Sequence, residues 1–392
     1  MPQSAGKRQG ITLILLSMLP ILAIAGLVAD LPVLLEVFRA APHHELLVPM
    51  VLTLPSLCVA LFSSVAGVIA DRWGRRPLLL LALAGFSLLG LAPLLFSSLT
   101  AVLASRVVVG LAEASILTCT NTLWGDYFPD DARRRWLGFQ QMSGPISNAL
   151  LALAGGALAA HHWASPFWLY LLGLPVLLLA TLYLHEPERT TTMNRAASPV
   201  PGNALAPFPW PIARRIAPVT LGVSIVFFML AIQQGRVFAA LGVDSPALSG
   251  QLIMMVSLAA IAGAACFNAL RRRPVAHLLS LGLGCYGISY VGIWMARSVT
   301  AGAVASALGQ FASSIVLAAL IAWTLTSFPP AHRGRGAGLW GAVFFAGQFV
   351  SAPLLTLLEH LADGLPTAFG IVGIAALIAT FTTLWINRKE RT

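Results

Sequence analysis

Charged residues are scarce in this sequence of 392 residues, because Asp, Glu, Lys and Arg together make up only 10% of it. Hydrophobic residues make up 58%, and the mean hydropathy is +0.83. Soluble domains carry about 25% charged residues. The composition therefore excludes an ordinary soluble globular protein and is typical of a polytopic membrane protein.

Lysine is almost absent, with Lys7 and Lys389 at the two ends of the chain and none between them. A phosphate-binding loop needs a lysine directly after its glycines, so ATP-driven transport by this chain alone is not expected. The net charge of +10 could indicate a nucleic-acid partner. The basic residues, however, separate apolar runs and form no continuous basic face, so we expect no nucleic-acid binding.

Cysteine is also scarce, and Cys58, Cys119, Cys266 and Cys285 lie singly within apolar runs without C-x-x-C spacing. Such cysteines are typical packing residues, so neither a disulfide nor a metal centre is expected. The sequence contains no His, Cys or Ser constellation with catalytic spacing. We therefore expect no metal, no cofactor and no enzymatic activity.

Long apolar runs dominate what is present. They cover residues 11–38, 48–70, 77–97, 99–125, 137–160, 165–184, 216–240, 248–270, 275–295, 299–327, 336–358 and 364–387. About twenty residues suffice to cross a hydrocarbon core of about 30 Å as a helix. The sequence thus predicts an all-α protein with twelve transmembrane helices.

Basic residues distribute unevenly between the two sides that these helices define. Of the 24 lysines and arginines, only Arg39, Arg236 and Arg297 fall on the side away from the termini, and Arg106 falls within a helix. Since cytoplasmic loops carry the excess of basic residues, both termini are predicted to be cytoplasmic. We expect a multi-pass protein of the inner (plasma) membrane that functions as a monomer.

The longest interruption of the apolar pattern is the proline-rich segment 185–215, which we interpret as a cytoplasmic linker. It would join two six-helix bundles, residues 1–184 and 216–392. The segment FPDDARRRWLG at 128–138 is echoed by FPPAHRGRGAG at 328–338. Such an echo indicates an internally duplicated transporter.

The segment GVIADRWGRRP, residues 67–77, is a basic turn between the second and third runs. It resembles the signature loop G-x-x-x-D-R-x-G-R-R/K between helices 2 and 3 of the major facilitator superfamily of secondary transporters. The resemblance implies that Arg75 pairs with Asp126 in the outward-open state, while Asp71 faces the start of helix 11. We therefore expect a conformational latch, and its residues would be Gly67, Asp71, Gly74, Arg75 and Asp126. An ordinary positively charged loop is the alternative.

Three charged residues lie within apolar helices, where charge is costly and often functional. Asp30 and Arg106 fall at comparable depth, so a pair between them is plausible, and Glu113 lies two turns beyond Arg106 on nearly the same face. Burial favours protonation of a carboxyl, and a neighbouring arginine opposes it. Asp30, Arg106 and Glu113 are thus candidates for proton coupling. A static ion pair that fixes packing is the alternative.

The superfamily resemblance extends to these residues. Arg106 followed by Gly110 resembles the helix 4 motif of proton-coupled members, and Asp30 before Pro32 resembles the drug:proton antiporter branch. The helix 5 motif of exporters is only partly present. Gly144 and Pro145 are retained, but Gln140 and the pair Asn148 and Ala149 stand where glycines are expected, which leaves the direction of transport open.

A substrate site is expected near mid-depth between the halves. The candidates are amides and aromatic residues near that depth, namely Asn121, Gln141, Asn148, Gln233, Gln234, Gln310, Trp340, Phe344 and Gln348. Each amide side chain could equally form a hydrogen bond that only packs two helices together. Few charges and many apolar walls favour an apolar or weakly polar compound.

These observations predict a proton-coupled secondary transporter that exports small hydrophobic or amphiphilic compounds by alternating access. Its partners would be a small-molecule substrate, protons and the lipid bilayer. One alternative is a proton symporter that imports a sugar or another metabolite. Another is a membrane sensor that keeps the fold without transporting.

Overall fold

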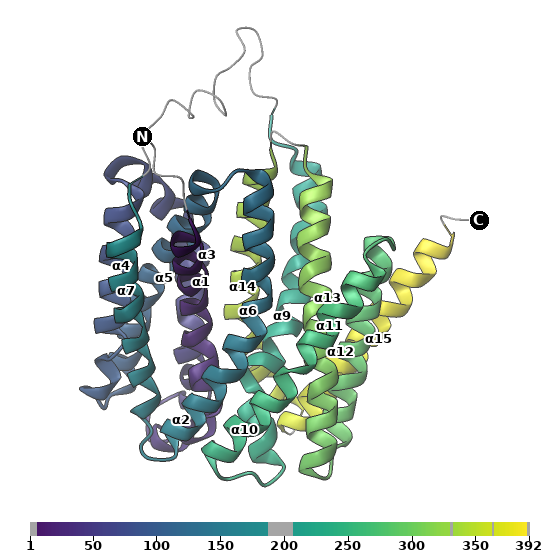
Figure 1. Cartoon of the computed structure of the whole chain (residues 1–392). Coiled ribbons are helices and arrows are strands. Elements are labelled where there is room, and N and C mark those ends of the chain that lie inside the picture. Colours follow the sequence, from purple (N-terminus) through teal and green to yellow (C-terminus); the bar gives the residue numbers. More distant parts are fainter. Residues whose placement is uncertain (1–5, 187–206, 330–331, 363, 390–392) are drawn as a thin grey trace.

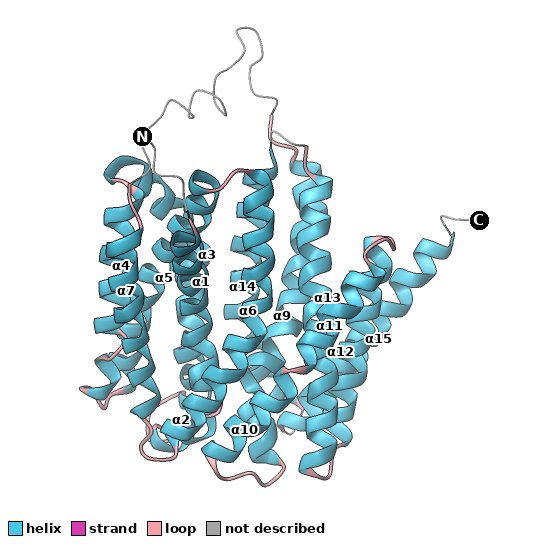
Figure 2. Ribbon diagram, viewed as in Figure 1, coloured by secondary structure: helices cyan, strands magenta, loops and turns pink. Residues whose placement is uncertain are grey.

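The computed structural model describes residues 6–186, 207–329, 332–362 and 364–389. Within these residues every regular element is a helix, and none is a strand (Figure 2). Twelve of the helical segments are long and apolar enough to cross a membrane. The predicted all-α fold with twelve transmembrane helices is therefore confirmed.

The first half of the chain forms six spans. They are α1 (Lys7–Val28) with the short α2 (Leu31–Val37), α3 (His44–Trp73), α4 (Arg75–Leu89) with the 3₁₀ turn η1 (Ala92–Leu94), α5 (Leu99–Tyr127), α6 (Asp130–Ala159), and the 3₁₀ helix η2 (Ser165–Leu172) continued by α7 (Gly173–Tyr183).

The second half forms the other six. They are α9 (Trp210–Ala240), α10 (Pro246–Ser257) with α11 (Ala259–Leu270), α12 (Val275–Met295), α13 (Val299–Ser327), α14 (Arg333–Leu361) and α15 (Leu365–Lys389).

Three boundaries differ from the predictions. The run 11–38 is interrupted at Ala29 and Asp30, because Pro32 occupies the first turn of a new helix and cannot donate a backbone hydrogen bond. The run 248–270 is interrupted at Leu258. α9 begins at Trp210, so 210–215 of the expected linker are helical, and 187–206 lie outside the described residues.

Equivalent helices of the two halves begin in the same way. The hydroxyl of Ser98 accepts a hydrogen bond from the backbone N–H of Ala101 at the start of α5, and Ser298 does the same for Ala301 at the start of α13. A serine in this position satisfies a donor that the first helical turn leaves free. The offset of these caps matches the offset of the Phe-Pro segments that indicated a duplication.

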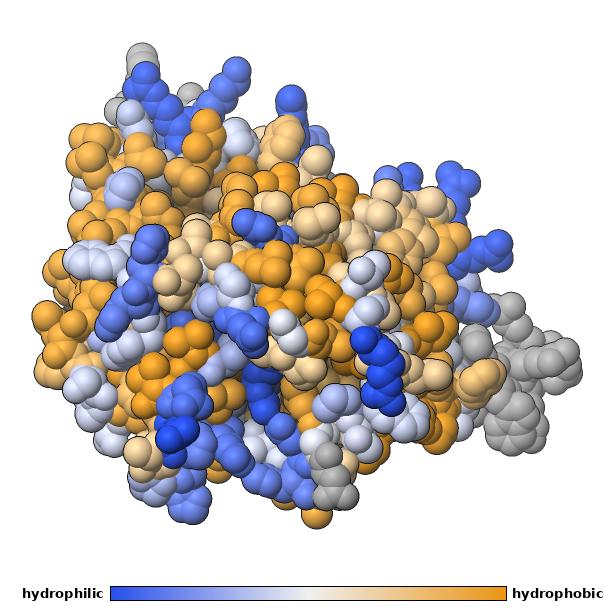
Figure 3. Space-filling view, turned by 90° about the horizontal axis from the view of Figure 1, so that it is seen from below, coloured by the Kyte–Doolittle hydropathy of each residue, from blue (hydrophilic) through white to orange (hydrophobic). Residues whose placement is uncertain are grey.

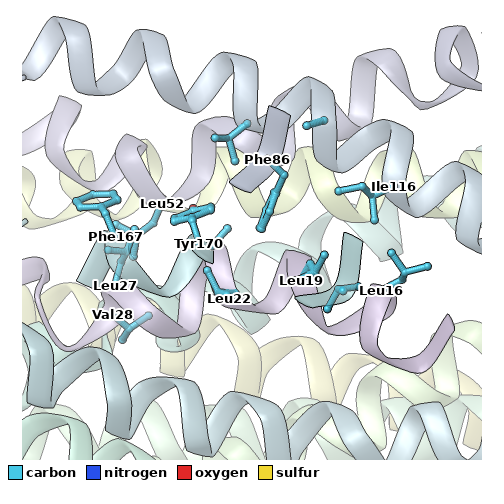
Figure 4. Packing of buried hydrophobic residues seen from close by; sticks show 14 of the residues in the cluster. Leu16, Leu19, Leu22, Leu27, Val28, Leu52, Phe86, Ile116, Phe167 and Tyr170 are labelled. Atoms are coloured by element: carbon cyan, nitrogen blue, oxygen red, sulfur yellow. The ribbon is translucent and has the colours of Figure 1, made fainter. Parts of the chain in front are cut away.

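Each half contains its own hydrophobic core. The first is centred on α1, α3, α4, α5 and η2 and includes Leu16, Leu19, Phe86 and Ile116 (Figure 4). The second is centred on α12, α13 and α15. The first core also includes Phe344 of α14 and residues of α9 and α10, so the halves pack against each other.

The two ends of the bundle differ in how closely the halves approach. We call the end where α1 and α14 begin the terminal end, and the end that bears α2 and the start of α10 the distal end (Figure 1). On α6, a methyl group at Gly156 would collide with the carbonyl of Pro246 and with Gly250. Nearer the terminal end, Gly138 and Gly144 of the same helix have nothing within 4 Å of such a methyl group. The halves are therefore closed at the distal end.

Candidate functional site

Asp30 lies in the turn between α1 and α2 and is fully buried. Neither of its carboxylate oxygens has a hydrogen-bond partner among the residues that the structure describes. The preceding residues Val28 and Ala29 lie against Gly235 of α9, so Asp30 sits beside the contact between the two halves. Because burial without a partner disfavours a charged carboxylate, this is a position at which proton binding and closure of the halves can be linked.

Arg106 of α5 is also fully buried, but it does not pair with Asp30. Its Nη1 donates to the hydroxyl of Tyr170 at 2.8 Å, and its Nη2 donates to the carbonyl of Gly90 at 3.1 Å. Its guanidinium carbon also lies 4.9 Å from the ring centroids of both Phe167 and Tyr170. The plausible pair between Asp30 and Arg106 is thus absent, because the arginine turns into the core of its own half.

Glu113 lies two turns beyond Arg106 on α5 and is 4% exposed. Its Oε1 has no hydrogen-bond partner among the described residues. Arg106 and Glu113 thus lie on one helix of the first half without forming an ion pair, whereas Asp30 lies at the contact between the halves.

The expected latch is partly assembled at the terminal end. Arg75 at the start of α4 forms an ion pair with Asp126 near the end of α5. Both residues belong to the first half, and the pair is present while the distal end is closed. The pair alone therefore cannot lock the two halves together, and its role as a latch stays a prediction.

Asp71 does not show the expected contact with the start of α14. Its side chain is exposed and makes no hydrogen bond or ion pair with another described residue. Gly67 lies against Thr118 of α5, and Gly74 adopts a φ of 103°, which favours glycine.

Glu186 contacts the basic turn 67–77, and the sequence analysis did not predict this contact. Its carboxylate accepts hydrogen bonds from the backbone N–H groups of Arg75 (2.8 Å) and Arg76 (2.7 Å) at the start of α4. A helix N-terminus favours a negative charge. In the sequence, the only indication of this role was that Glu186 directly follows the sixth apolar run and precedes a proline. Through these hydrogen bonds Glu186 joins the start of the linker to the basic turn.

The amide candidates of the second half lie on α9, α13 and α14. Gln234 of α9 accepts a hydrogen bond from Gln310 of α13 at 3.0 Å, and Gln233 accepts one from Arg236 at 3.4 Å. Gln233 and Gln234 are fully buried, as is almost all of Gln348 on α14. Each of these three retains an amide atom without a partner. Unpaired buried amide groups are costly, and Gln233, Gln234 and Gln348 are closed off from solvent in this state.

The first-half candidates are not brought to this group of amides. Asn148 of α6 donates to the hydroxyl of Ser257 on α10 at 3.0 Å, a hydrogen bond that joins the two halves. Asn121 and Gln141 are exposed. Asn148 thus takes part in the contact between the halves, whereas Asn121 and Gln141 are not buried with the second-half amides.

Aromatic side chains of α9 and α14 pack together at the contact between the halves. The ring of Trp340 stacks on that of Phe344 with centroids 5.1 Å apart, and Phe344 also contacts Phe227 and Phe228 of α9 and Phe345 of its own helix. Phe344 and Trp340 pack against the first half's core as well. An apolar ligand between the halves would meet these rings.

A charged hollow of about 600 Å³ lies at the distal end and was not predicted. Within it Arg236 forms a bidentate ion pair with Glu359 at 2.7 and 3.0 Å. His360 lies 3.0 Å from the carboxylate of Glu45, across the contact between halves. From this side, hydrophilic side chains gather among hydrophobic ones (Figure 3). Glu359 and His360 fall just past an apolar run, so the sequence suggested a loop.

Comparison with known proteins places these features in a family context. A family model described as Major Facilitator Superfamily matches residues 13–278. The multidrug efflux pump LfrA of Mycolicibacterium smegmatis is 31% identical over 166 residues, which cover 41% of this chain and 32% of that protein. The class C tetracycline resistance protein of Escherichia coli is 31% identical over 233 residues, covering 56% of this chain and 54% of that protein. The chain thus matches about half or less of the length of these relatives.

Solved structures share the fold over nearly the whole chain. A crystal structure of a D-xylose–proton symporter has a TM-score of 0.75 and 15% sequence identity, covering 95% of this chain and 96% of that one. At this identity the likeness concerns the fold alone. It is the fold of a transporter built from two helical halves.

Proposed function

The chain belongs to the Major Facilitator Superfamily, and we propose that it is a proton-coupled exporter of small hydrophobic or amphiphilic compounds. Its termini would lie in the cytoplasm and its distal end would face outward. In this orientation the structure corresponds to the state that is closed toward the outside. The cycle would proceed by rocking of the two halves around a central site.

The observation on which this proposal depends is the carboxyl of Asp30, buried and unpartnered beside the contact between halves. A proton on Asp30 would favour the closed contact, because the neutral carboxyl is cheaper to bury than the charged one. When the distal end opens, water would reach the same carboxyl. Proton binding and the conformational equilibrium are then coupled, as proton-driven transport requires.

The chemistry of the substrate follows from the walls of the central region. The stacked pair Trp340 and Phe344 offers an apolar surface, and Gln233, Gln234 and Gln348 offer unpaired amide groups. Among the described residues of the second half, Arg236 is a partly buried charge, and it is neutralised by its ion pair with Glu359. The walls around Trp340 and Phe344 therefore carry no unpaired charge from Arg236. Such walls suit aromatic or amphiphilic compounds with one or two polar groups. The names of the relatives, which include multidrug and tetracycline exporters, support the same class.

A proton symporter that imports a metabolite is the second candidate. Asn148, which stands in place of a glycine in the exporter motif of helix 5, forms a hydrogen bond between the halves. This departure from the exporter pattern favours import. The direction of proton-driven flux separates the two candidates.

The test is uptake of ethidium and tetracycline into everted membrane vesicles that contain this chain. Export predicts energised uptake of at least one of them, lost when a protonophore is added and absent from vesicles without the chain. Uptake that persists with the protonophore would contradict proton coupling. If neither compound is taken up while sugars accumulate in right-side-out vesicles, the importer replaces the exporter.

A further inference from the structure

The distal part of the sixth span is wound as a 3₁₀ helix over eight residues, Ser165–Leu172. Runs of this kind rarely exceed three or four residues. In a 3₁₀ helix, residues three apart stand one above the other. Phe167 and Tyr170 are three apart, and their rings are stacked with centroids 6.4 Å apart and planes 14° apart. The unusual winding thus aligns two aromatic rings on one face, in the core of the first half (Figure 4).

Arg106 occupies the space that these two rings face. Its guanidinium carbon lies 4.9 Å from each ring centroid, and its Nη1 donates to the Tyr170 hydroxyl at 2.8 Å. The carbonyl of Gly90 accepts from Nη2 on the other side. A methyl group at Gly90 would collide with the ring of Tyr170, so the glycine is required for this close packing.

This aromatic enclosure takes the place of a counter-ion. Arg106 is fully buried, and no carboxylate among the described residues lies within ion-pair distance of it. An uncompensated buried charge is strongly unfavourable. Ring faces and charge-assisted hydrogen bonds stabilise a guanidinium in such surroundings.

The enclosure also determines where the arginine points. Side chains of a helix lean toward its N-terminus, and Tyr170 and Gly90 hold Arg106 in that direction, toward the distal end. Glu113 lies two turns away toward the terminal end. The charged and titratable groups that interact with Glu113 are Arg106 on its own helix, Cys58 on α3 and Tyr170 in η2.

We propose that Phe167 and Tyr170 form a guanidinium clamp whose role is to position Arg106 away from Glu113 while the distal end is closed. This inference rests on the proposed proton coupling and adds Glu113 to Asp30 as a second carboxyl that binds and releases a proton. While the clamp holds Arg106, the carboxyl of Glu113 keeps its proton. When the clamp releases Arg106, the guanidinium pairs with Glu113, the O–H bond breaks and the proton passes to water.

The test is the Tyr170→Phe variant, which keeps the ring but removes the hydroxyl that holds Nη1. Arg106 is then freer to approach Glu113 and favours its charged form. The pH at half-maximal proton-driven ethidium transport should fall by about one unit. Trp168→Leu is the matched control, because Trp168 lies in the same 3₁₀ segment but is 50% exposed, and its profile should coincide with that of the wild type.

A second readout needs no substrate and is independent of the proposed function. The melting temperature of purified Tyr170→Phe should lie below that of the wild type, and the deficit should shrink from pH 5 to pH 8. The reason is that its folded state binds fewer protons at Glu113 than the wild type does. In a Glu113→Gln background the deficit should be the same at every pH.

The outcomes separate the two claims. If the wild type does not exchange protons for ethidium but the pH-dependent deficit is present, the proposed function fails and the clamp stands. If Tyr170→Phe lowers the melting temperature equally at every pH and leaves the transport profile unchanged, the enclosure is only structural and the inference is overturned.

Discussion

Asp30 shows how a single residue can link proton binding to conformation. It is a carboxylic acid with no partner for either oxygen, and it lies beside the point where α1 meets Gly235 of α9. Opening the distal end would separate these helices and expose the carboxyl. The coupling that we propose therefore depends on the ability of this group to ionise.

Replacement of Asp30 by asparagine should abolish uphill transport. The amide keeps the shape and the neutral charge of the protonated acid, so the protein should still fold and equilibrate substrate down its gradient. Accumulation of ethidium in energised everted vesicles should fall to the level seen with a protonophore.

Glu36→Gln is the matched control for this prediction. Glu36 is an exposed carboxylate six residues further on, paired with Arg39 at 3.0 Å, and exposed pairs contribute little. Ethidium accumulation by the Glu36→Gln variant should match that of the wild type. Retained uphill accumulation by Asp30→Asn would show that another group carries the proton.

Residue identities and depths could be read from the sequence, but the partners of those residues could not. Counting along helices placed Asp30 and Arg106 at comparable depth, yet the arginine is held by Tyr170 and Gly90. Depth follows from the rise per residue, whereas the direction in which each side chain points depends on how the helix is rotated in the bundle. Glu186 and the pair of Glu45 with His360 went unrecognised for the same reason.

At the scale of elements, the closed distal end depends on glycine at the contact between α6 and α10. Gly156 and Gly250 face each other, and a methyl group on either would collide with the backbone of the other helix. Close helix contacts of this kind are common where small residues meet in membrane proteins. The distal-closed state therefore tolerates no side chain here.

The Gly156→Leu variant should shift the equilibrium toward the state that is open at the distal end. Overpacking typically costs about 1–3 kcal/mol, which corresponds to roughly a 5–150-fold change in population. The measurement is the rate at which a membrane-impermeant maleimide labels a cysteine introduced at Ser249, a buried residue of α10, in a variant without the native cysteines.

Gly144→Leu on the same helix provides the control, because a methyl group there meets nothing within 4 Å. Labelling should accelerate in Gly156→Leu and remain at the background rate in Gly144→Leu. Equal rates in both variants would mean that α6 and α10 do not close this end.

Most elements were predictable because length and apolarity alone identify membrane-spanning helices. The interruptions at Ala29 and Leu258 were not predicted. Asp30 and Pro32 were the available signal for the first, whereas the residues around Leu258 are as apolar as the rest of that run. The 3₁₀ winding of Ser165–Leu172 could not be predicted either. Almost all residues of this segment are apolar, so no spacing of polar and apolar residues distinguishes a 3₁₀ helix from an α-helix. Such local changes of helix type depend on tertiary contacts, here with Arg106 and Gly90.

At the scale of the whole molecule, a duplicated pair of halves meets at the distal end and along mid-depth. The hydrogen bond of Asn148 with Ser257 and the contact of His360 with Glu45 both bridge the halves. All such contacts must break in the opposite state, so their total strength has to remain modest. One proton crossing 100 mV supplies about 2.3 kcal/mol, enough for a substrate gradient of roughly fortyfold.

We propose above that substrate and proton move in opposite directions through this chain alone. The most direct test is purified protein in liposomes with an imposed pH gradient and no other energy source. For a proton-coupled exporter, we expect ethidium to accumulate on the acidic side and the accumulation to disappear when the gradient is dissipated. Liposomes with the Asp30→Asn variant should accumulate no ethidium. Accumulation on the alkaline side, or accumulation that survives without the gradient, would contradict proton-coupled export.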